Sequence, residues 1–234
     1  MHPEVSSFAN RHFYNGQLCP VPLPHQTSTL PYNTYDKASA LQALIATHRT
    51  VFINCPVPKQ EERFKTNSHE AQLCAMVVKN IIELYRTNGI PYDAHQTIGI
   101  ISPFRGQGAL IRNELSLLDM EEYTQHISID TVERYQGSQR DIIIYCTTIT
   151  SPSQMELIVE AIDPTSPIVN QPIDRKLNVA LTRARMQLFV IGIPQVLDTD
   201  CNYRALINEL PQYLHPTAEY CNQSSNNVPK NSGR

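Results

Sequence analysis

The chain has 234 residues, of which 41% are hydrophobic and 18% are charged, and its formal net charge is −3. These values are typical of a globular protein and exclude a general electrostatic attraction to nucleic acid, so a polyanion site must be a local patch. No apolar run approaches the about 20 residues of a membrane span, and no signal peptide is evident. Because no span is evident, no membrane partner is expected. Six dispersed cysteines without a Cys-x-x-Cys pair indicate a cytoplasmic protein without a zinc site.

Residues 1–48 are predicted to form an irregular N-terminal arm, because the stretch CPVPLPHQTSTLPYNTYD is rich in proline. A short helical pattern, KASALQALIATH, ends this arm. From residue 49 the pattern changes to alternating strands and helices, which predicts one α/β domain over 49–212. The polar, low-complexity tail 213–234 is predicted to be disordered.

Within 49–212, short apolar runs predict buried strands at 50–57, 96–103, 126–132, 141–148 and 187–194. Segments with one apolar face predict helices at 68–89, 106–119, 171–184 and 202–214. Asn67 or Ser68 can cap the first of these helices, and Gly89 can end it. Apolar strands that alternate with helices are typical of a parallel sheet covered on both faces.

A phosphate-binding loop is missing from this sequence. Its eight glycines form no Gly-x-x-x-x-Gly-Lys-Ser/Thr pattern, and no acidic pair follows a predicted strand. Such features hold the phosphates and the magnesium ion of a nucleotide. If the chain takes part in nucleotide chemistry, we expect it to supply only part of the site.

The polar clusters of this sequence are expected at the carboxyl ends of the predicted strands, beyond which ligands of doubly wound sheets bind. Ser102 and Pro103 begin a predicted helix whose first N–H groups can bind a phosphate. Phe104 and Arg105 add a stacking surface and a cation, which suit a single strand of nucleic acid. A plain capped turn is the commoner alternative for so short a stretch.

Two further clusters carry polar side chains. The loop DTVERYQGSQRD, 130–141, contains Gly137, which allows a positive φ or a close backbone approach to a ligand. A solvated connection is the simpler interpretation of this loop. In NVALTRAR, 178–185, Arg183 and Arg185 close a predicted helix, where they form either a basic helix end or a fork presented to an anion.

Together, the phrases MHPEVSSF…FYNGQL, IGIISPFRGQ, IDTVERYQGSQRDIIIY and RKLNVALTRAR resemble the second motor domain of superfamily 1 helicases, in particular the upframeshift-type (5′-to-3′) group. The resemblance spans residues 1 to about 195. It implies a RecA-like fold, with a parallel sheet and helices on both faces, that lacks its own P-loop. It also implies ATP and Mg²⁺ as cofactors, bound mainly by a first RecA-like domain of the same parent protein.

The resemblance also implies roles for individual residues. Arg183 matches the arginine finger that reaches the γ-phosphate, and Arg185 is expected to brace the cleft or to pair with an acid. Gly137 and Gln139 match the contact to the nucleotide ribose, although the family usually has glutamate at position 139, and Arg185 is expected with them among the residues that bind the nucleotide. The residues expected to contact single-stranded DNA or RNA are Ser102, Pro103, Phe104, Arg105, Gln107, Thr131, Arg134 and Gln136.

In the family, the MHP phrase follows a glutamine-tyrosine-arginine run whose arginine touches the γ-phosphate, and this sequence begins at the methionine. We therefore expect one half of an ATP-dependent helicase, excised or truncated, which is inactive alone. A non-catalytic nucleic-acid-binding module of helicase fold is the alternative. An unrelated α/β enzyme is a third hypothesis, for which the sequence offers no nucleophile–base pair.

Overall fold

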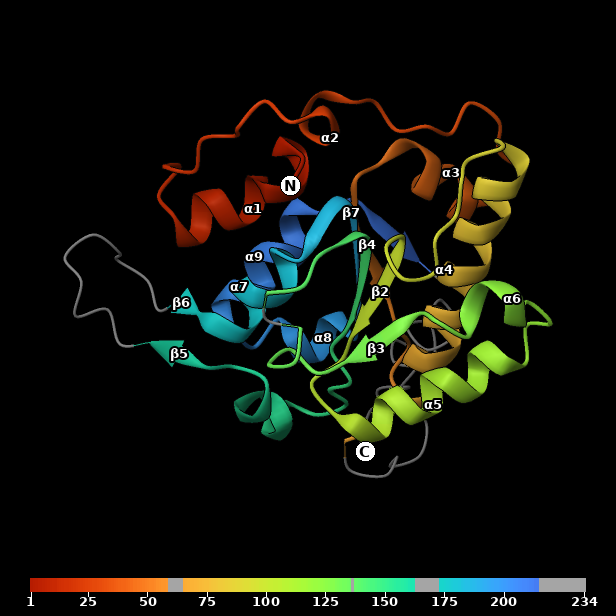
Figure 1. Ribbon diagram of the computed structural model, residues 1–234. Helices are drawn as coiled ribbons and strands as arrows, with labels where there is room; N and C mark the ends of the chain where they lie inside the picture. The colour runs from red at the N-terminus through yellow and green to blue at the C-terminus, as the bar shows by residue number, and fades with distance from the viewer. Residues whose placement is uncertain (59–64, 136, 163–172, 215–234) are drawn as a thin grey trace, which may run out of the picture.

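The computed structural model describes residues 1–58, 65–135, 137–162 and 173–214 (Figure 1). In this part of the chain, six strands form a parallel sheet in the order β3-β2-β4-β7-β1-β8. Their bounds are β1 Thr50–Asn54, β2 Ile98–Ile101, β3 Ser128–Asp130, β4 Arg140–Cys146, β7 Ala184–Gly192 and β8 Gln212–Leu214. A separate antiparallel pair consists of β5 Ala161–Ile162 and β6 Ile173–Asp174.

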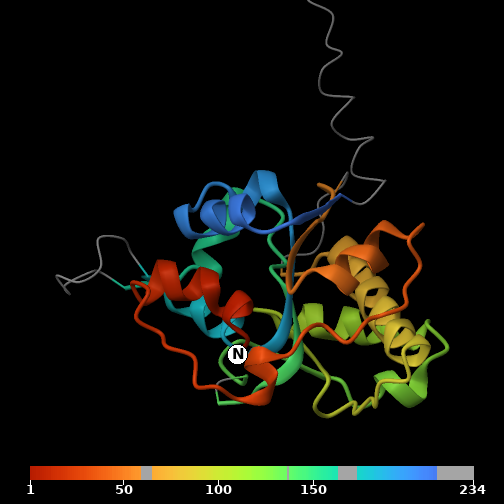
Figure 2. The same ribbon diagram turned by 90° about the horizontal axis from the view of Figure 1, so that it is seen from above.

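Helices cover both faces of the sheet, as Figure 2 shows, with α3, α4 and α5 on one side and α1, α7 and α9 on the other. This architecture confirms the predicted RecA-like α/β fold. The helices are α1 Pro3–Phe13, α2 Pro24–Thr27, α3 Ala40–Thr47, α4 Ser68–Thr87, α5 Arg105–Ser116, α6 Glu121–Thr124, α7 Arg175–Leu181, α8 Pro194–Leu197 and α9 Cys201–Glu209, with a 3₁₀ helix η1 at Pro152–Leu157. Within the described residues, none of these has both the length and the apolar character that a membrane crossing needs.

The central strands are buried because both of their faces are covered. Residues 51–53 of β1, 142–146 of β4 and 188–191 of β7 all lie in the core. Each was part of a continuous apolar run in the sequence, as expected for strands without a solvent face. The α4 helix is capped by Asn67, whose Oδ1 accepts a hydrogen bond from the backbone N–H of Glu70 at 3.1 Å.

The N-terminal region contains more helix than the sequence predicted. The α1 helix has His2 as its N-cap and Pro3 in its first turn, and it buries Val5, Phe8 and Phe13 against β7, α7 and α9. Proline is favourable at the first helical position, and the apolar residues follow a helical period, so the signal was present. The expectation of a wholly irregular arm was therefore wrong for this stretch.

Two predicted helices are shorter than expected. The α7 helix ends at Leu181, and Ala184, which completes the apolar helical repeat in sequence, is instead the first residue of β7. The predicted helix 202–214 ends at Glu209, and its last residues form β8, which pairs with β1. Strand β8 therefore includes two residues assigned to the tail, and 215–234 lie outside the described residues.

Candidate functional site

The predicted site residues fall at two opposite edges of the sheet. At the carboxyl edge, β2 and β3 end at Ile101 and Asp130, whereas at the amino edge β4 and β7 begin at Arg140 and Ala184. The sequence predicted that all the polar clusters lie at the carboxyl edge, and this was wrong for 137–139 and 183–185. The loop after β3 must return along the sheet to start the parallel β4, and the two arginines flank the start of β7 rather than its end.

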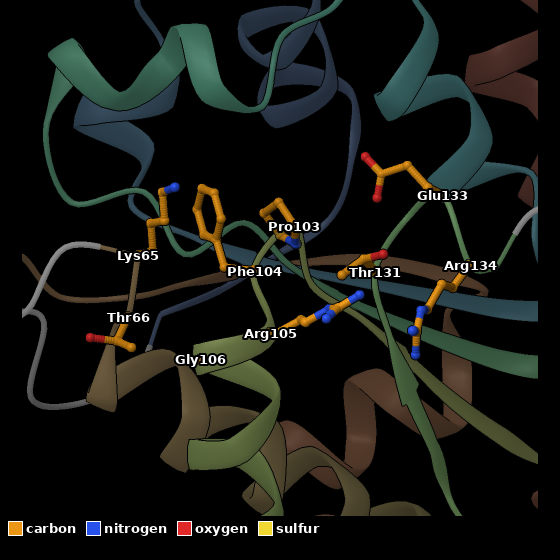
Figure 3. A pocket seen from close by; sticks show the side chains of 9 residues that line it. All are labelled: Lys65, Thr66, Pro103, Phe104, Arg105, Gly106, Thr131, Glu133 and Arg134. Atoms are coloured by element: carbon orange, nitrogen blue, oxygen red, sulfur yellow. The ribbon is translucent and has the colours of Figure 1, made fainter.

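A hollow of ≈ 650 Å³ lies at the carboxyl edge, around the start of α5 and the loop that follows β3 (Figure 3). The residues that line this carboxyl-edge hollow are Lys65, Thr66, Pro103, Phe104, Arg105, Gly106, Thr131, Glu133 and Arg134. The fold thus brings together Pro103, Phe104, Arg105, Thr131 and Arg134, which the sequence singled out in two separate stretches.

The hollow combines positive charge with an aromatic ring. The Nζ of Lys65 lies 5.6 Å from the centre of the Phe104 ring, within the range of a cation–π contact. The α5 helix begins at Arg105, so its first backbone N–H groups lie beside the same space. Arg134 is exposed and stands 3.6 Å from Asp130, an ion pair that water and salt screen.

Two predicted contact residues point into the protein instead. Gln107 is fully buried, and its amide accepts from the backbone N–H of Asn67 and donates to the carbonyl of Asn67, both at 2.8 Å. Ser102 is also buried, with its Oγ 3.1 Å from the Oγ1 of Thr148. Direct contact of these two side chains with a ligand was therefore a wrong expectation, because both are sealed in the polar core beneath the hollow. Gln136 lies outside the described residues.

Other residues of this edge were missed by sequence reasoning. Lys65 and Thr66 line the hollow because they precede Asn67, the N-cap of α4. Glu70, in the first turn of α4, is fully buried; its Oε2 accepts from the backbone N–H of Thr148 at 2.8 Å. An asparagine followed three residues later by glutamate resembles a helix-start signal, which placed the helix correctly but did not reveal the hollow in front of it.

At the amino edge, the backbone joins the two predicted nucleotide-binding stretches. The N–H of Arg140 donates to the carbonyl of Arg183 at 3.1 Å, which brings Gln139 beside the end of α7. Gly137 has φ +84°, a conformation that favours glycine. The N-terminal phrase reaches the same place, since the N–H of His2 donates to the carbonyl of Arg185 at 2.7 Å.

Arg183 follows the end of α7 and is half-buried. Its Nε donates to the carbonyl of Val179 at 3.1 Å, and its Nη2 donates to the Oγ1 of Thr182 at 3.0 Å. Burial lowers the pKa of Arg183, an effect that Tyr14 opposes, and an arginine remains charged at neutral pH. Among the described residues no carboxylate lies within ion-pair distance of this side chain.

Arg185, two residues later in β7, is neutralised. Its Nε lies 3.0 Å from the Oδ1 of Asp141, and its Nη2 donates to the Oε1 of Gln96 at 3.2 Å. Burial raises the pKa of Asp141, although Arg185 and His25 both act to lower it. Among the described residues, the two arginines of the NVALTRAR stretch therefore differ: Arg185 has a carboxylate partner and Arg183 has none.

The fold and the two edges define the class of this protein. A parallel sheet covered on both faces, with basic residues at both edges, is the architecture of a RecA-like domain. Residues 1–195 match the model of a family described as "AAA domain", and the chain belongs to that family. The match and the relatives below confirm the resemblance to superfamily 1 helicases of the upframeshift type.

The chain is similar to regulator of nonsense transcripts 1 of Dictyostelium discoideum, with 29% identity over 214 residues. It is also similar to helicase SEN1 of Saccharomyces cerevisiae, with 26% identity over 210 residues. Each alignment covers 89% of this chain but only 14% and 8% of the respective relative. DNA polymerase alpha-associated DNA helicase A of the same yeast is 32% identical over 155 residues, which are 64% of this chain and 18% of that protein.

Proposed function

We propose that this chain is the second motor domain of an ATP-dependent nucleic-acid helicase. It supplies Arg183 to ATP bound by a first RecA-like domain, and it grips a single strand in the carboxyl-edge hollow. The named helicases among its relatives support a helicase-type parent protein.

The observation that carries this proposal is the charge of Arg183. This guanidinium is half-buried and has no carboxylate partner among the described residues, so an approaching anion would stabilise it, and its planar fork matches a phosphate group. The hydrogen bonds of Nε and Nη2 hold the side chain at the end of α7, and no partner of Nη1 is found among the described residues. An arginine in this position is worth about 10³ to 10⁵ in the rate of phosphoryl transfer.

The residues at the amino edge fit part of a nucleotide site. Arg183 would meet the negative charge that develops on the γ-phosphate, and Gly137 and Gln139 would lie beside the ribose. ATP supplies the phosphoryl group when it is bound. Following the family resemblance, we assign Mg²⁺ to the first domain.

The carboxyl-edge hollow fits the backbone of a single strand. Phe104 offers a face on which a base can stack, while Lys65, Arg105 and Arg134 offer positive charge to phosphates. Thr131 lines this hollow, and Gln139 of the same loop directly precedes β4 at the amino edge. Movement of this loop would therefore connect strand binding with the nucleotide site.

The test compares the chain alone with a protein that joins it to a first RecA-like domain carrying a P-loop. We expect the chain alone to bind single strands without hydrolysing ATP, and the joined protein to hydrolyse ATP when a single strand is added. Arg183→Ala should abolish this ATPase activity while the thermal melt and strand binding persist. Turnover by the chain alone, or normal turnover by the variant, would contradict the proposal. Strand binding without turnover by the joined protein would favour the non-catalytic module.

A further inference from the structure

Glu133 is a carboxylate in a hollow that otherwise suits phosphates. Glu133 is the acidic residue among the nine that line the hollow, and Lys65, Arg105 and Arg134 are the basic ones. Figure 3 shows its side chain directed towards the space beside Pro103, from the side opposite Phe104. A negative charge in this position repels the phosphates of any strand that enters, so its presence calls for a chemical reason.

The fold holds the backbone of Glu133 at this place. The neighbouring Val132 is 3% exposed and Tyr135 is 2% exposed, so the chain is anchored on both sides of Glu133. The hydroxyl of Tyr135 also donates to the carbonyl of Ser128 at 3.2 Å. The side chain of Glu133 itself is 64% exposed, so it is available to a ligand in the hollow.

An ion pair with Lys176 does not occupy the carboxylate. The Nζ of Lys176 lies 3.9 Å from the Oε1 of Glu133, which is beyond hydrogen-bond distance, and it donates to the carbonyl of Leu157 at 3.4 Å. Glu133 therefore keeps acceptor capacity for a donor that a ligand brings.

The backbone of a nucleic acid offers such a donor only in RNA. An ionised carboxylate accepts hydrogen bonds and donates none, and the sugar-phosphate backbone of DNA carries acceptors alone. The ribose 2′-hydroxyl is a donor as well as an acceptor. We propose that Glu133 accepts a hydrogen bond from a 2′-hydroxyl, and that the hollow therefore selects RNA over DNA. This inference rests on the proposed binding of a single strand in the hollow.

The test measures the affinity of the 234-residue chain for single-stranded RNA and DNA of one sequence, by fluorescence anisotropy at fixed salt. We expect RNA to bind about 5-fold more tightly, because the typical net contribution of one hydrogen bond corresponds to about that factor in affinity. In Glu133→Ala the RNA-to-DNA ratio should fall to about 1, with DNA binding more tightly than to the wild type. Glu133→Gln, which keeps an acceptor oxygen, should give an intermediate ratio.

Two controls separate the donor from other effects. Glu122→Gln removes the same charge from α6, outside the hollow, and should leave the ratio unchanged. RNA with 2′-fluorine in place of the hydroxyl keeps an RNA-like sugar but lacks the donor, so it should bind to the wild type like DNA. Lys176→Gln removes the ion pair without removing the acceptor, and the RNA preference should persist.

The outcomes distinguish this inference from the proposed function. An unchanged ratio in Glu133→Ala, or tight binding of the 2′-fluoro strand, overturns the role of Glu133 and leaves the strand grip intact. Arg105→Ala should weaken RNA and DNA equally, which tests the grip itself. If the wild type binds neither strand, the grip and the inference both fail. A melt of each variant by circular dichroism verifies that the loop change leaves the fold in place.

Discussion

The two edges of the sheet hold their arginines in different ways. At the carboxyl edge, Arg134 is exposed and faces Asp130 across 3.6 Å, beside a hollow that is open to a long ligand. At the amino edge, Arg183 is half-buried and held by two hydrogen bonds, and Arg185 is paired with Asp141. Exposed, screened cations suit a polymer that must bind and release, whereas a fixed guanidinium suits one phosphate in one position.

The largest expected effect is on the ATPase rate, and it should differ between the two arginines of the amino edge. In the joined protein, Arg183→Lys should lower the ATPase rate about 10³-fold, because lysine keeps the charge but loses the fork and the hydrogen bond to Val179. Arg185→Lys should lower the rate about 10-fold or less, since Asp141 already neutralises this position. The measurement is steady-state ATP hydrolysis with saturating single strand. Equal losses in the two variants would remove the distinction between the arginines.

The carboxyl edge should respond in binding rather than in hydrolysis. Phe104→Ala should weaken single-strand binding about 10-fold, because one base loses its stacking surface. Arg105→Ala should lower the slope of log affinity against log salt by about 1, as expected for one phosphate contact. Leu117→Ala is the control, since Leu117 is an exposed apolar residue outside the hollow. If it weakened binding as much as Phe104→Ala, the hollow would not be the binding site.

A smaller effect should come from the loop that connects the edges. Gly137 has φ +84°, and a Cβ added there would meet open space, so Gly137→Ala costs backbone strain of about 1 kcal/mol without a steric clash. Gly89 has φ +62° and equally open surroundings, so Gly89→Ala is a matched control. Both variants should lose similar stability in urea, but only Gly137→Ala should raise the KM for ATP in the joined protein. A raised KM in both would show a global effect.

The sequence predicted the central strands β1, β4 and β7 well because they are buried on both faces, whereas the exposed edge strand β8 was predicted as part of a helix and of the tail. The run 141–148 contains the uninterrupted apolar stretch 142–146, and this stretch forms the buried part of β4. The errors come from places where local patterns continue across a structural change. The apolar spacing of Leu181 and Ala184 fits a helix, but the chain turns at Thr182 and Ala184 belongs to β7.

The candidate sites were harder to predict from the sequence than the fold. Gln107 belongs to a polar stretch, yet it is fully buried. The backbone N–H and carbonyl of Asn67, 40 residues earlier, form hydrogen bonds with the two ends of its side-chain amide. Lys65 and Thr66 carried no local signal, and only the packing of α4 beside α5 places them at the hollow. Partners that are distant in sequence therefore decide which polar residues remain available to a ligand.

The smallest expected effect concerns the pairing that distinguishes Arg185 from Arg183. Because burial raises the pKa of Asp141 above its ordinary value of 3.8, the folded chain holds this proton at a pH where the unfolded chain has lost it. This carboxyl therefore lowers the free energy of unfolding as pH rises from about 4 through its folded pKa. Asparagine does not ionise, so the stability of Asp141→Asn relative to the wild type should rise over that interval. The change should be less than about 1 kcal/mol, since the group is partly exposed and screened.

Urea unfolding of the two proteins between about pH 4 and 7 measures this difference, because linkage predicts its sign as well as its position on the pH scale. Asp141→Asn also removes the carboxylate that pairs with Arg185. If burial dominates at this site, the variant gains relative stability towards neutral pH despite the lost ion pair. A relative loss of stability over the same interval would instead mean that the Arg185–Asp141 attraction exceeds the cost of burying the charge, and that the amino edge is held together by this pair.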